Sequence, residues 1–373
     1  MEKRLIDICT PKQWKTIATK DLLEDGYPVY GANGQIGFYD KYTHEEATLM
    51  ITCRGATCGS LNISRPYSYI NGNAMALDNL DENIELKYLY YFLKSRGLLD
   101  TISGSAQPQI TRNSLAKVIV RYPEKNLQLK IVRILDKAQE LIDKRKKQIE
   151  ELDLLVKSKF IEMFGNPSTN SKGWILDKLS NCLINIENGK SFICENYKRK
   201  GEYPAILKLS AVTYGVYNQF ENKALIDEFS FVEKVEVKKS DLLFTRKNTP
   251  ELVGMSAYVY ETEPSLMMPD LIFRLNTNEN INKIFLWKLI NHDLFREKIK
   301  ALSNGSAKSM SNISKQRLME LKIPVPPIEL QNQFAEFVKQ VDKLKFEMEK
   351  SLKELEDNFN SLMQKAFKGE LFK

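Results

Sequence analysis

Two long stretches of the chain place apolar residues at a spacing of three and four. They run from Leu127 to Phe164 and from Ile328 to Phe367, and neither contains glycine or proline. This 3.6-residue period predicts two amphipathic helices. At 1.5 Å per residue, a helix of about 38 residues is about 57 Å long, far beyond the usual length in a globular domain.

The two predicted helices belong to an internal repeat with an offset of 203 residues, in which Gln128 matches Gln331. The apolar stripe of each helix is narrow, which favours pairing of the two as an antiparallel coiled coil. Burial of each helix in a separate core is the alternative. The residues that we expect in the coiled coil and its partner-binding surface are Ile131, Leu135, Ile149, Leu152, Val156, Phe334, Val338, Leu352, Leu355 and Phe359.

The segments before the helices carry short β-branched or aromatic runs separated by Gly, Asn and Pro, which predicts strand-rich domains. In each, an apolar strand ends in threonine and a basic residue follows, Arg54 in the first copy and Arg246 in the second. A turn, two strands, a helix and a Gly-Ser-Ala loop then come in the same order. The pattern predicts a mixed α/β (α+β) fold with a pseudo-two-fold repeat: a strand-rich domain at 1–125, a long helix at 126–164, a second domain at 165–327 and a second long helix at 328–369.

Composition narrows the class of protein further. The 373 residues carry a formal charge of +7, and no stretch has the length and apolarity of a membrane span. His44 and His292 are the only histidines, which excludes a multi-histidine metal site, and the five cysteines form no C-x-x-C pair. We therefore expect a cytoplasmic protein with free thiols, no membrane association and no metal.

The sequence contains no complete catalytic motif of the kinds considered below. Asn188-Gly189-Lys190-Ser191 resembles the end of a phosphate-binding loop, but the first glycine that the loop requires is replaced by Ile184. No Asn/Asp-Pro-Pro-aromatic string of an adenine methyltransferase occurs. Pro269-Asp270 begins a nuclease-like pattern that is not completed downstream. We expect a protein without catalysis and without a cofactor of its own.

Polar side chains gather instead in corresponding loops of the two domains. The charge is +5 over residues 165–328 and +1 over residues 1–125, a modest footprint for nucleic acid. Arg and Lys suit guanine edges or phosphates, and Asn and Gln suit adenine, whereas a solvated loop is the alternative for each single residue. The candidate DNA-binding residues are Asn33, Gln35, Arg54, Gln107, Gln109, Thr111, Arg112, Lys190, Thr213, Tyr214, Arg246, Lys247, Asn248, Lys308, Asn312 and Lys315.

In this layout the chain resembles the specificity subunit of a Type I restriction–modification system over nearly its whole length. The resemblance rests on the paired helices with their lead-ins VIVRYPEKNLQ and KIPVPPIELQ, on the endings FIEMFGNP and LMQKAFKGEL, and on the strings GSAQPQI, GSAKSM, YPVYGANGQIG and DLLFTRKN. Two departures stand out. The first domain lacks the Gly173-Trp174 lead-in of the second, and Lys308 stands where the first loop has Gln107.

The resemblance implies two target-recognition domains that each read half of a split duplex DNA sequence, with the long helices setting the gap. It also implies two modification subunits, which hold S-adenosylmethionine and methylate adenine, and a restriction subunit that joins them. A coiled-coil scaffold that joins two protein partners without DNA is the competing class. Sequence-dependent affinity for duplex DNA would separate the two.

Overall fold

The chain, in a computed structural model, divides into two compact units, and the structure describes residues 1–104, 107–303 and 310–372. Unit 1 comprises Met1–Lys147 with Met348–Lys373, and unit 2 comprises Gln148–Glu347. Both unit boundaries lie within the long helices, so each long helix belongs in part to unit 1 and in part to unit 2. The expected fold class is confirmed: the structure has two strand-rich domains and two long helices.

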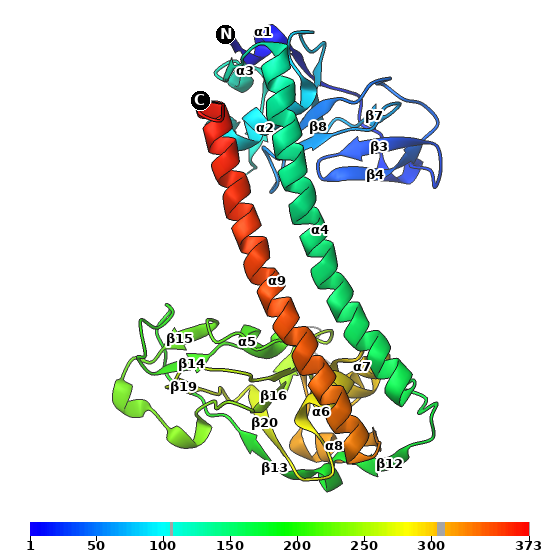
Figure 1. Cartoon of the computed structure of the whole chain (residues 1–373), viewed down its shortest axis with the longest axis vertical. Coiled ribbons are helices and arrows are strands. Elements are labelled where there is room, and N and C mark those ends of the chain that lie inside the picture. Colours follow the sequence, from blue (N-terminus) through cyan, green and yellow to red (C-terminus); the bar gives the residue numbers. More distant parts are fainter. Residues whose placement is uncertain (105–106, 304–309, 373) are drawn as a thin grey trace. The chain divides into compact units, whose positions relative to one another are not determined.

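The main sheet of unit 1 is antiparallel, in the order β2-β8-β5-β6, and a three-stranded sheet β4-β3-β7 lies beside it (Figure 1). Two further strand pairs are β1-β11 and β9-β10. Ile51 lies opposite Met75 in this sheet. The register is well defined because the strands carry runs of apolar residues that are buried on both faces of the sheet. The strands are β1 Glu2–Arg4, β2 Thr10–Gln13, β3 Tyr27–Gly31, β4 Gly34–Tyr39, β5 Leu49–Thr52, β6 Leu61–Ile63, β7 Tyr69–Ile70, β8 Ala74–Asp78, β9 Ile102–Ser103, β10 Gln109–Ile110 and β11 Ile119–Arg121.

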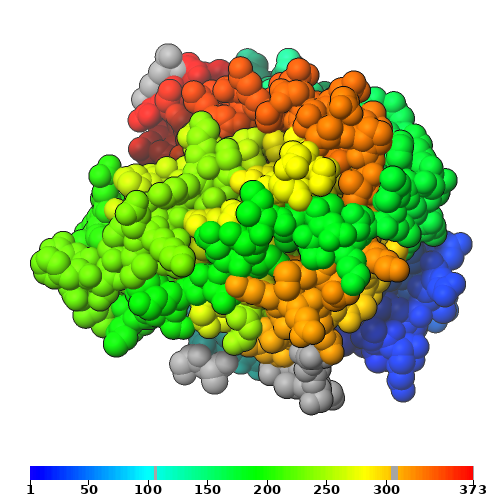
Figure 2. Space-filling model, turned by 90° about the horizontal axis from the view of Figure 1, so that it is seen from below, coloured from blue at the N-terminus to red at the C-terminus, as the bar shows by residue number. Residues whose placement is uncertain are grey.

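Unit 2 repeats this topology with other residues. Its main sheet has the order β13-β20-β16-β18, its small sheet has the order β15-β14-β19, and β12-β22 takes the place of β1-β11. The strands are β12 Ile175–Lys178, β13 Leu183–Asn188, β14 Ala205–Leu207, β15 Asn222–Ala224, β16 Leu242–Thr245, β17 Lys247–Asn248, β18 Ser256–Tyr258, β19 Leu266–Met267, β20 Ile272–Thr277, β21 Ser311–Asn312 and β22 Lys322–Val325. In Figure 2, green segments that follow the first long helix lie directly against orange segments from the end of this unit, as the β12-β22 pair requires.

Short helices complete each unit. In unit 1 these are α1 Leu5–Ile8, α2 Leu86–Arg96, α3 Arg112–Leu115, and the 3-10 turns η1 Thr19–Asp21 and η2 Leu99–Thr101. In unit 2 these are α5 Ser210–Thr213, α6 Lys283–Asn291, α7 Asp293–Lys300, α8 Lys315–Met319, and the 3-10 turns η3 Leu179–Cys182, η4 Glu228–Ser230 and η5 Glu233–Val235. The long helices are α4 Lys125–Phe164 and α9 Ile328–Lys368, close to the predicted limits. None of the described helices combines the length and apolarity needed to cross a membrane.

The two long helices pack against each other and against the sheet domain within each unit, so each core contains residues of both helices and neither helix is buried in a separate core. In unit 2 they run antiparallel, since Asp153 pairs with Lys345 while the ring of Phe160 lies 5.5 Å from that of Phe334. Most of the residues predicted for the coiled coil lie in the cores of the two units or at their edges. Ile131, Leu135 and Phe359 are buried in unit 1, with Leu352 and Leu355 packed at the edge, whereas Val156, Phe334 and Val338 are buried in unit 2, with Leu152 at the edge and Ile149 half-buried.

The first turn of each long helix is anchored in the same way. The Gln128 side chain accepts a hydrogen bond from the Glu85 amide (2.9 Å) and donates to the carbonyls of Asn83 and Pro123 (2.8 and 2.9 Å). Gln331 makes the same three contacts, with the Asn282 amide and the carbonyls of Asn280 and Pro326. Both glutamines are fully buried. These bonds satisfy backbone groups in two turns, the one before the short helix α2 or α6 and the one before the long helix, which would otherwise stay unpaired.

The first strand of unit 1 lies in the same place as the first strand of unit 2. The Leu5 amide donates to the Val118 carbonyl, and the Leu179 amide donates to the Leu321 carbonyl, both at 2.8 Å. Strand β1 therefore occupies in unit 1 the place that β12 occupies in unit 2. The departure noted in the sequence affects Gly173-Trp174 and not the strand itself.

Candidate nucleic-acid interface

The candidate site of each unit begins where the third strand of its main sheet ends. Thr52 ends β5 and Thr245 ends β16, and in both cases a loop returns to the threonine through a glycine amide, of Gly59 (2.8 Å) or Gly254 (2.9 Å). Gly254 has φ +75°, and a Cβ there would lie 2.3 Å from the Ile299 side chain. The glycine is required for this close turn.

The strand register corrects the pairing of the two basic residues. Arg54 bridges Gln109, and Lys247 pairs with Asn312, so Arg54 corresponds to Lys247. Cys53 and Arg246 are the next matched pair, since each accepts a hydrogen bond at its carbonyl from the residue after the bridge, Ile110 or Ile313. The sequence interpretation that matched Arg54 with Arg246 was wrong by one residue, because the sequence does not reveal where the two loops pair.

In unit 1 three loops meet at this strand end. Arg54 and Gln109 are exposed and stand side by side, because directly opposed residues of a bridge point to the same face. The Thr57 hydroxyl donates to Asn33 Oδ1 (2.6 Å), which ties in the β3–β4 turn with exposed Asn33 and Gln35. Gln107 is exposed on the third loop. The structure thus gathers five of the seven unit 1 candidates around one strand end.

The other two unit 1 candidates lie on α3. The Thr111 hydroxyl accepts the Ser114 amide (3.2 Å) and Ser114 Oγ accepts the Thr111 amide (3.1 Å), which forms a capping box. Arg112 follows at the first helical position and is exposed. The geometry favours a structural role for the Thr111 side chain, whereas Arg112 is free to contact a partner.

In unit 2 the equivalent strand end is more cationic. Arg246 donates from Nη2 to Asn312 Oδ1 (3.2 Å), and its guanidinium lies 5.0 Å from the centre of the Phe273 ring. Its Nε is buried and has no acceptor among the described residues. Lys315 lies 5.9 Å from the same ring and donates to the Ile186 carbonyl (2.6 Å). Half-buried Lys247 completes the group.

The remaining unit 2 candidates divide between buried and exposed positions. Asn248 Nδ2 donates to Thr213 Oγ1 (3.0 Å), and both residues are buried, which favours a structural role for this pair. Tyr214 beside them is 73% exposed. Lys190 is exposed, in the loop after β13, 5.7 Å from the Phe192 ring. Lys308 lies outside the described residues.

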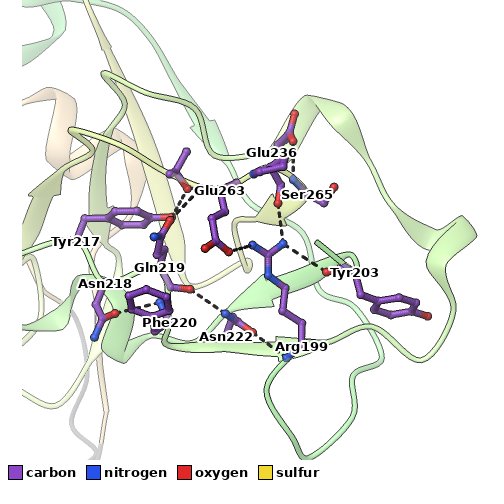
Figure 3. Close-up of polar contacts among 12 residues, drawn as sticks. Arg199, Tyr203, Tyr217, Asn218, Gln219, Phe220, Asn222, Glu236, Glu263 and Ser265 are labelled. Atoms are coloured by element: carbon purple, nitrogen blue, oxygen red, sulfur yellow. Dashed lines mark hydrogen bonds and ion pairs between the residues drawn. The ribbon is translucent and has the colours of Figure 1, made fainter. Parts of the chain in front are cut away.

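The residues that support the small sheet of unit 2 were not predicted from the sequence. Arg199 donates to Glu263 Oε2 (2.7 Å) and to the carbonyl of Pro264 (2.6 Å), and only 2% of its side chain is exposed (Figure 3). Its backbone amide donates to Asn222 Oδ1, so one buried arginine links its own loop to the start of β15 and to the loop before β19. Nearby, Lys198 lies 4.4 Å from the Phe220 ring, a cation and an aromatic ring together at the surface. Basic residues flanking aromatic ones in 198–220 were the available signal.

Among the described residues, no histidine or cysteine has the surroundings of a nucleophilic site. His44 contacts Thr43 Oγ1 (2.7 Å) and Asp78 Oδ1 (2.9 Å), but that hydroxyl already accepts the Ile70 amide and so joins its loop to β7. His292 is buried beside Phe160, and burial lowers its pKa. Burial raises the pKa of the Cys9 thiol to about 12 and that of Cys182 to about 11. These thiols stay protonated at neutral pH. The described residues contain no cluster of metal-binding side chains.

Comparison with known proteins identifies the class. The family model described as Type I restriction modification DNA specificity domain matches residues 1–153 and 181–357, and the chain belongs to this family. The chain is 22% identical to the Type I restriction enzyme MjaVIII specificity subunit of Methanocaldococcus jannaschii, across 94% of this chain and 87% of that protein. It is 28% identical to the EcoEI specificity subunit of Escherichia coli, across 46% of this chain and 30% of that protein. The putative MjaX specificity subunit of M. jannaschii is 26% identical, across 53% of this chain and 46% of that protein. The chain thus spans less than half the length of two of these three relatives.

Solved structures show the same fold. The Type I restriction–modification S subunit from M. genitalium superposes with a TM-score of 0.61 at 18% identity, covering 98% of this chain and 96% of that one. A chain from a structure concerned with complex assembly and conformational transition of the Type I system gives 0.55 at 16% identity, covering 100% and 98%.

Proposed function

We propose that this chain is the non-catalytic, sequence-specific DNA-binding subunit of a Type I restriction–modification system and that it recognises a bipartite duplex target. One observation carries the proposal: the same strand end, with one cationic and one amide side chain across a bridge, occurs once in each unit. Membership of the specificity family supports it. Two equivalent sites fit a target in two halves.

The polar groups at each strand end suit duplex DNA. Amide side chains pair with base edges in the major groove, and exposed cations contact phosphates or guanine. Arg54 and Gln109 would do this in unit 1, and Arg246, Lys247 and Asn312 in unit 2. Chemistry would come from partners: two modification subunits that carry S-adenosylmethionine, and a restriction subunit, in the cytoplasm.

The long helices would set the distance between the half-sites and provide the surface on which the modification subunits assemble. At 1.5 Å per residue, the 40 residues of α4 extend about 60 Å, comparable to between one and two turns of duplex DNA at about 34 Å each. Removing the same number of residues from both helices would shorten the gap and leave the bases in each half unchanged.

Domain exchange tests the proposal. Replacing residues 165–327 with the corresponding domain of another family member should change one half of the methylated sequence and leave the other half intact, as read by mapping methylated adenines. Deleting about seven residues from each long helix is the matched variant and should alter only the spacer. A change in both halves after the exchange would contradict the proposal.

A gel shift with duplex DNA separates the proposal from the competing scaffold class. The full chain with its modification subunits should bind one duplex sequence more tightly than random duplexes. Equal affinity for every sequence would favour a protein scaffold that joins two partners. Methylation or cleavage by the purified chain alone would also overturn the non-catalytic role.

A further inference from the structure

In each unit an amide side chain lies opposite a basic residue at the strand end. The two amides differ in how many of their hydrogen-bonding groups are free. Gln109 in unit 1 and Asn312 in unit 2 occupy the same place, opposite Arg54 and Lys247 respectively. Gln109 is exposed, and its side-chain amide makes no hydrogen bond within the described part of the chain. It therefore keeps both its acceptor oxygen and its donor nitrogen available.

The amide of Asn312 is already engaged. Arg246 Nη2 donates to Asn312 Oδ1 at 3.2 Å. The opposite orientation would set the amide N–H groups against the guanidinium N–H groups, so the charge of Arg246 dictates which way the amide faces. The groups that the couple still offers are N–H donors: Asn312 Nδ2 and the terminal guanidinium nitrogens of Arg246, whose Nε is buried.

The cause of the difference is one matched position. Unit 1 has Cys53 where unit 2 has Arg246. The Cys53 thiol is buried and contacts Gln13 Nε2 (3.0 Å) and the Asn73 carbonyl (3.2 Å), away from Gln109. Arg246 instead rests on the Phe273 ring, which corresponds to Met75 in unit 1. The aromatic ring supports a planar cation at this place in unit 2.

We propose that Gln109 selects adenine in the half-site bound by unit 1, and that the Arg246–Asn312 couple selects guanine at the equivalent contact in unit 2. This inference rests on the proposed DNA-binding function. The major-groove edge of adenine presents one acceptor and one donor, which a free amide matches with two hydrogen bonds. The edge of guanine presents two acceptors, N7 and O6, which only donors match.

Selection from a pool of randomised duplexes tests the assignment, with the full chain bound to its modification subunits. Wild type should enrich two separated sequence blocks. Arg246→Cys, which installs the unit 1 residue, frees the Asn312 amide and should change one position of one block from guanine to adenine. The ratio of the two bases at that position should move by between about 5-fold and about 150-fold, the range that one bidentate contact provides.

Two further variants keep the test decisive if Arg246→Cys folds poorly. Asn312→Ala removes a half-buried side chain but leaves Arg246, so it should weaken the guanine preference at the same position without creating an adenine preference. Gln109→Ala should erase an adenine preference at one position of the other block. Lys247→Ala is the control: we expect weaker binding to all sequences, with a smaller dependence on salt and unchanged base frequencies.

The outcomes separate this inference from the proposed function. If the variants bind and leave every base frequency as in wild type, the assignment of bases is wrong while the DNA-binding function stands. If wild type enriches no sequence although the complex is assembled, the proposed function fails and the base assignment fails with it.

Discussion

Unit 1 and unit 2 share their scaffold but differ in the polar residues that fill it. Both have the same strand order, the same buried glutamine at the start of a long helix and the same loop that returns to a strand-final threonine. At matched positions, however, Ala76 of unit 1 corresponds to Arg274 of unit 2, and Asp81 corresponds to Asn278. The residues that the shared backbone requires are therefore the same in both units. Side chains that face the sheet interior or the loops differ between them.

The largest difference lies in the middle of the main sheets. Arg274 is 8% exposed and donates to Asp241 (2.9 Å), to Glu187 (2.8 Å) and to the Glu236 carbonyl. Burial raises the pKa of Asp241, although the nearby guanidinium acts in the opposite direction. The matched Ala76 of unit 1 is buried among apolar residues and needs no such partners.

Arg274→Ala therefore has the largest expected effect. The substitution installs the unit 1 residue but leaves Asp241 buried without its cation, which should lower the free energy of unfolding by about 3 to 5 kcal/mol. Denaturant unfolding followed by the fluorescence of buried Trp287 measures it. Adding Asp241→Ala to the variant should recover part of the loss in a double-mutant cycle. A loss below about 1 kcal/mol would show that the ion pair adds little to unit 2.

Gln128→Leu and Gln331→Leu test what the units have in common. Each change leaves one backbone amide and two carbonyls near a helix start without their partner, so we expect each to cost about 1 to 3 kcal/mol. Hydrogen exchange should localise the loss of protection to residues 83–85 in one variant and to residues 280–282 in the other. Clearly different losses of stability in the two variants would show that the two glutamines are not equivalent. Gln340→Leu, at an exposed position of α9, is the control and should be nearly neutral.

Asp81→Asn should have the smallest effect and acts through pH. Hydrogen bonds from the Asn83 amide, followed by Lys3, hold the pKa of Asp81 down at about 2. A lowered acid pKa gives stability that is present above the unfolded value of about 4 and is lost as pH falls toward 2. The variant, which carries the unit 2 residue type, should lose this dependence. Unfolding midpoints between about pH 2 and pH 6 would show it, and parallel curves for wild type and variant would contradict it. Lys3→Met should remove part of the same dependence.

Much of the architecture was predictable because it depends on local periodicity. The 3.6-residue spacing predicted both long helices to within two residues of their observed ends, and the repeat of Gln128 in Gln331 indicated two equivalent units. The candidate residues on loops were harder. Asn33, Gln35, Arg54, Gln107 and Gln109 do gather at one strand end, whereas Thr213 and Asn248 turn toward each other and away from solvent. The residue type shows that a side chain is polar but not whether it points toward solvent.

The sequence by itself determined the helices, the internal repeat and the scarcity of catalytic side chains, since spacing and residue type are local properties. Only the tertiary structure decided that Arg54 matches Lys247 and that Arg246 holds the oxygen of Asn312. Both facts depend on a bridge between segments about 55 to 65 residues apart in the chain. The physical reason is that cross-strand register and the orientation of an amide are set by hydrogen bonds between distant segments, which no local pattern records.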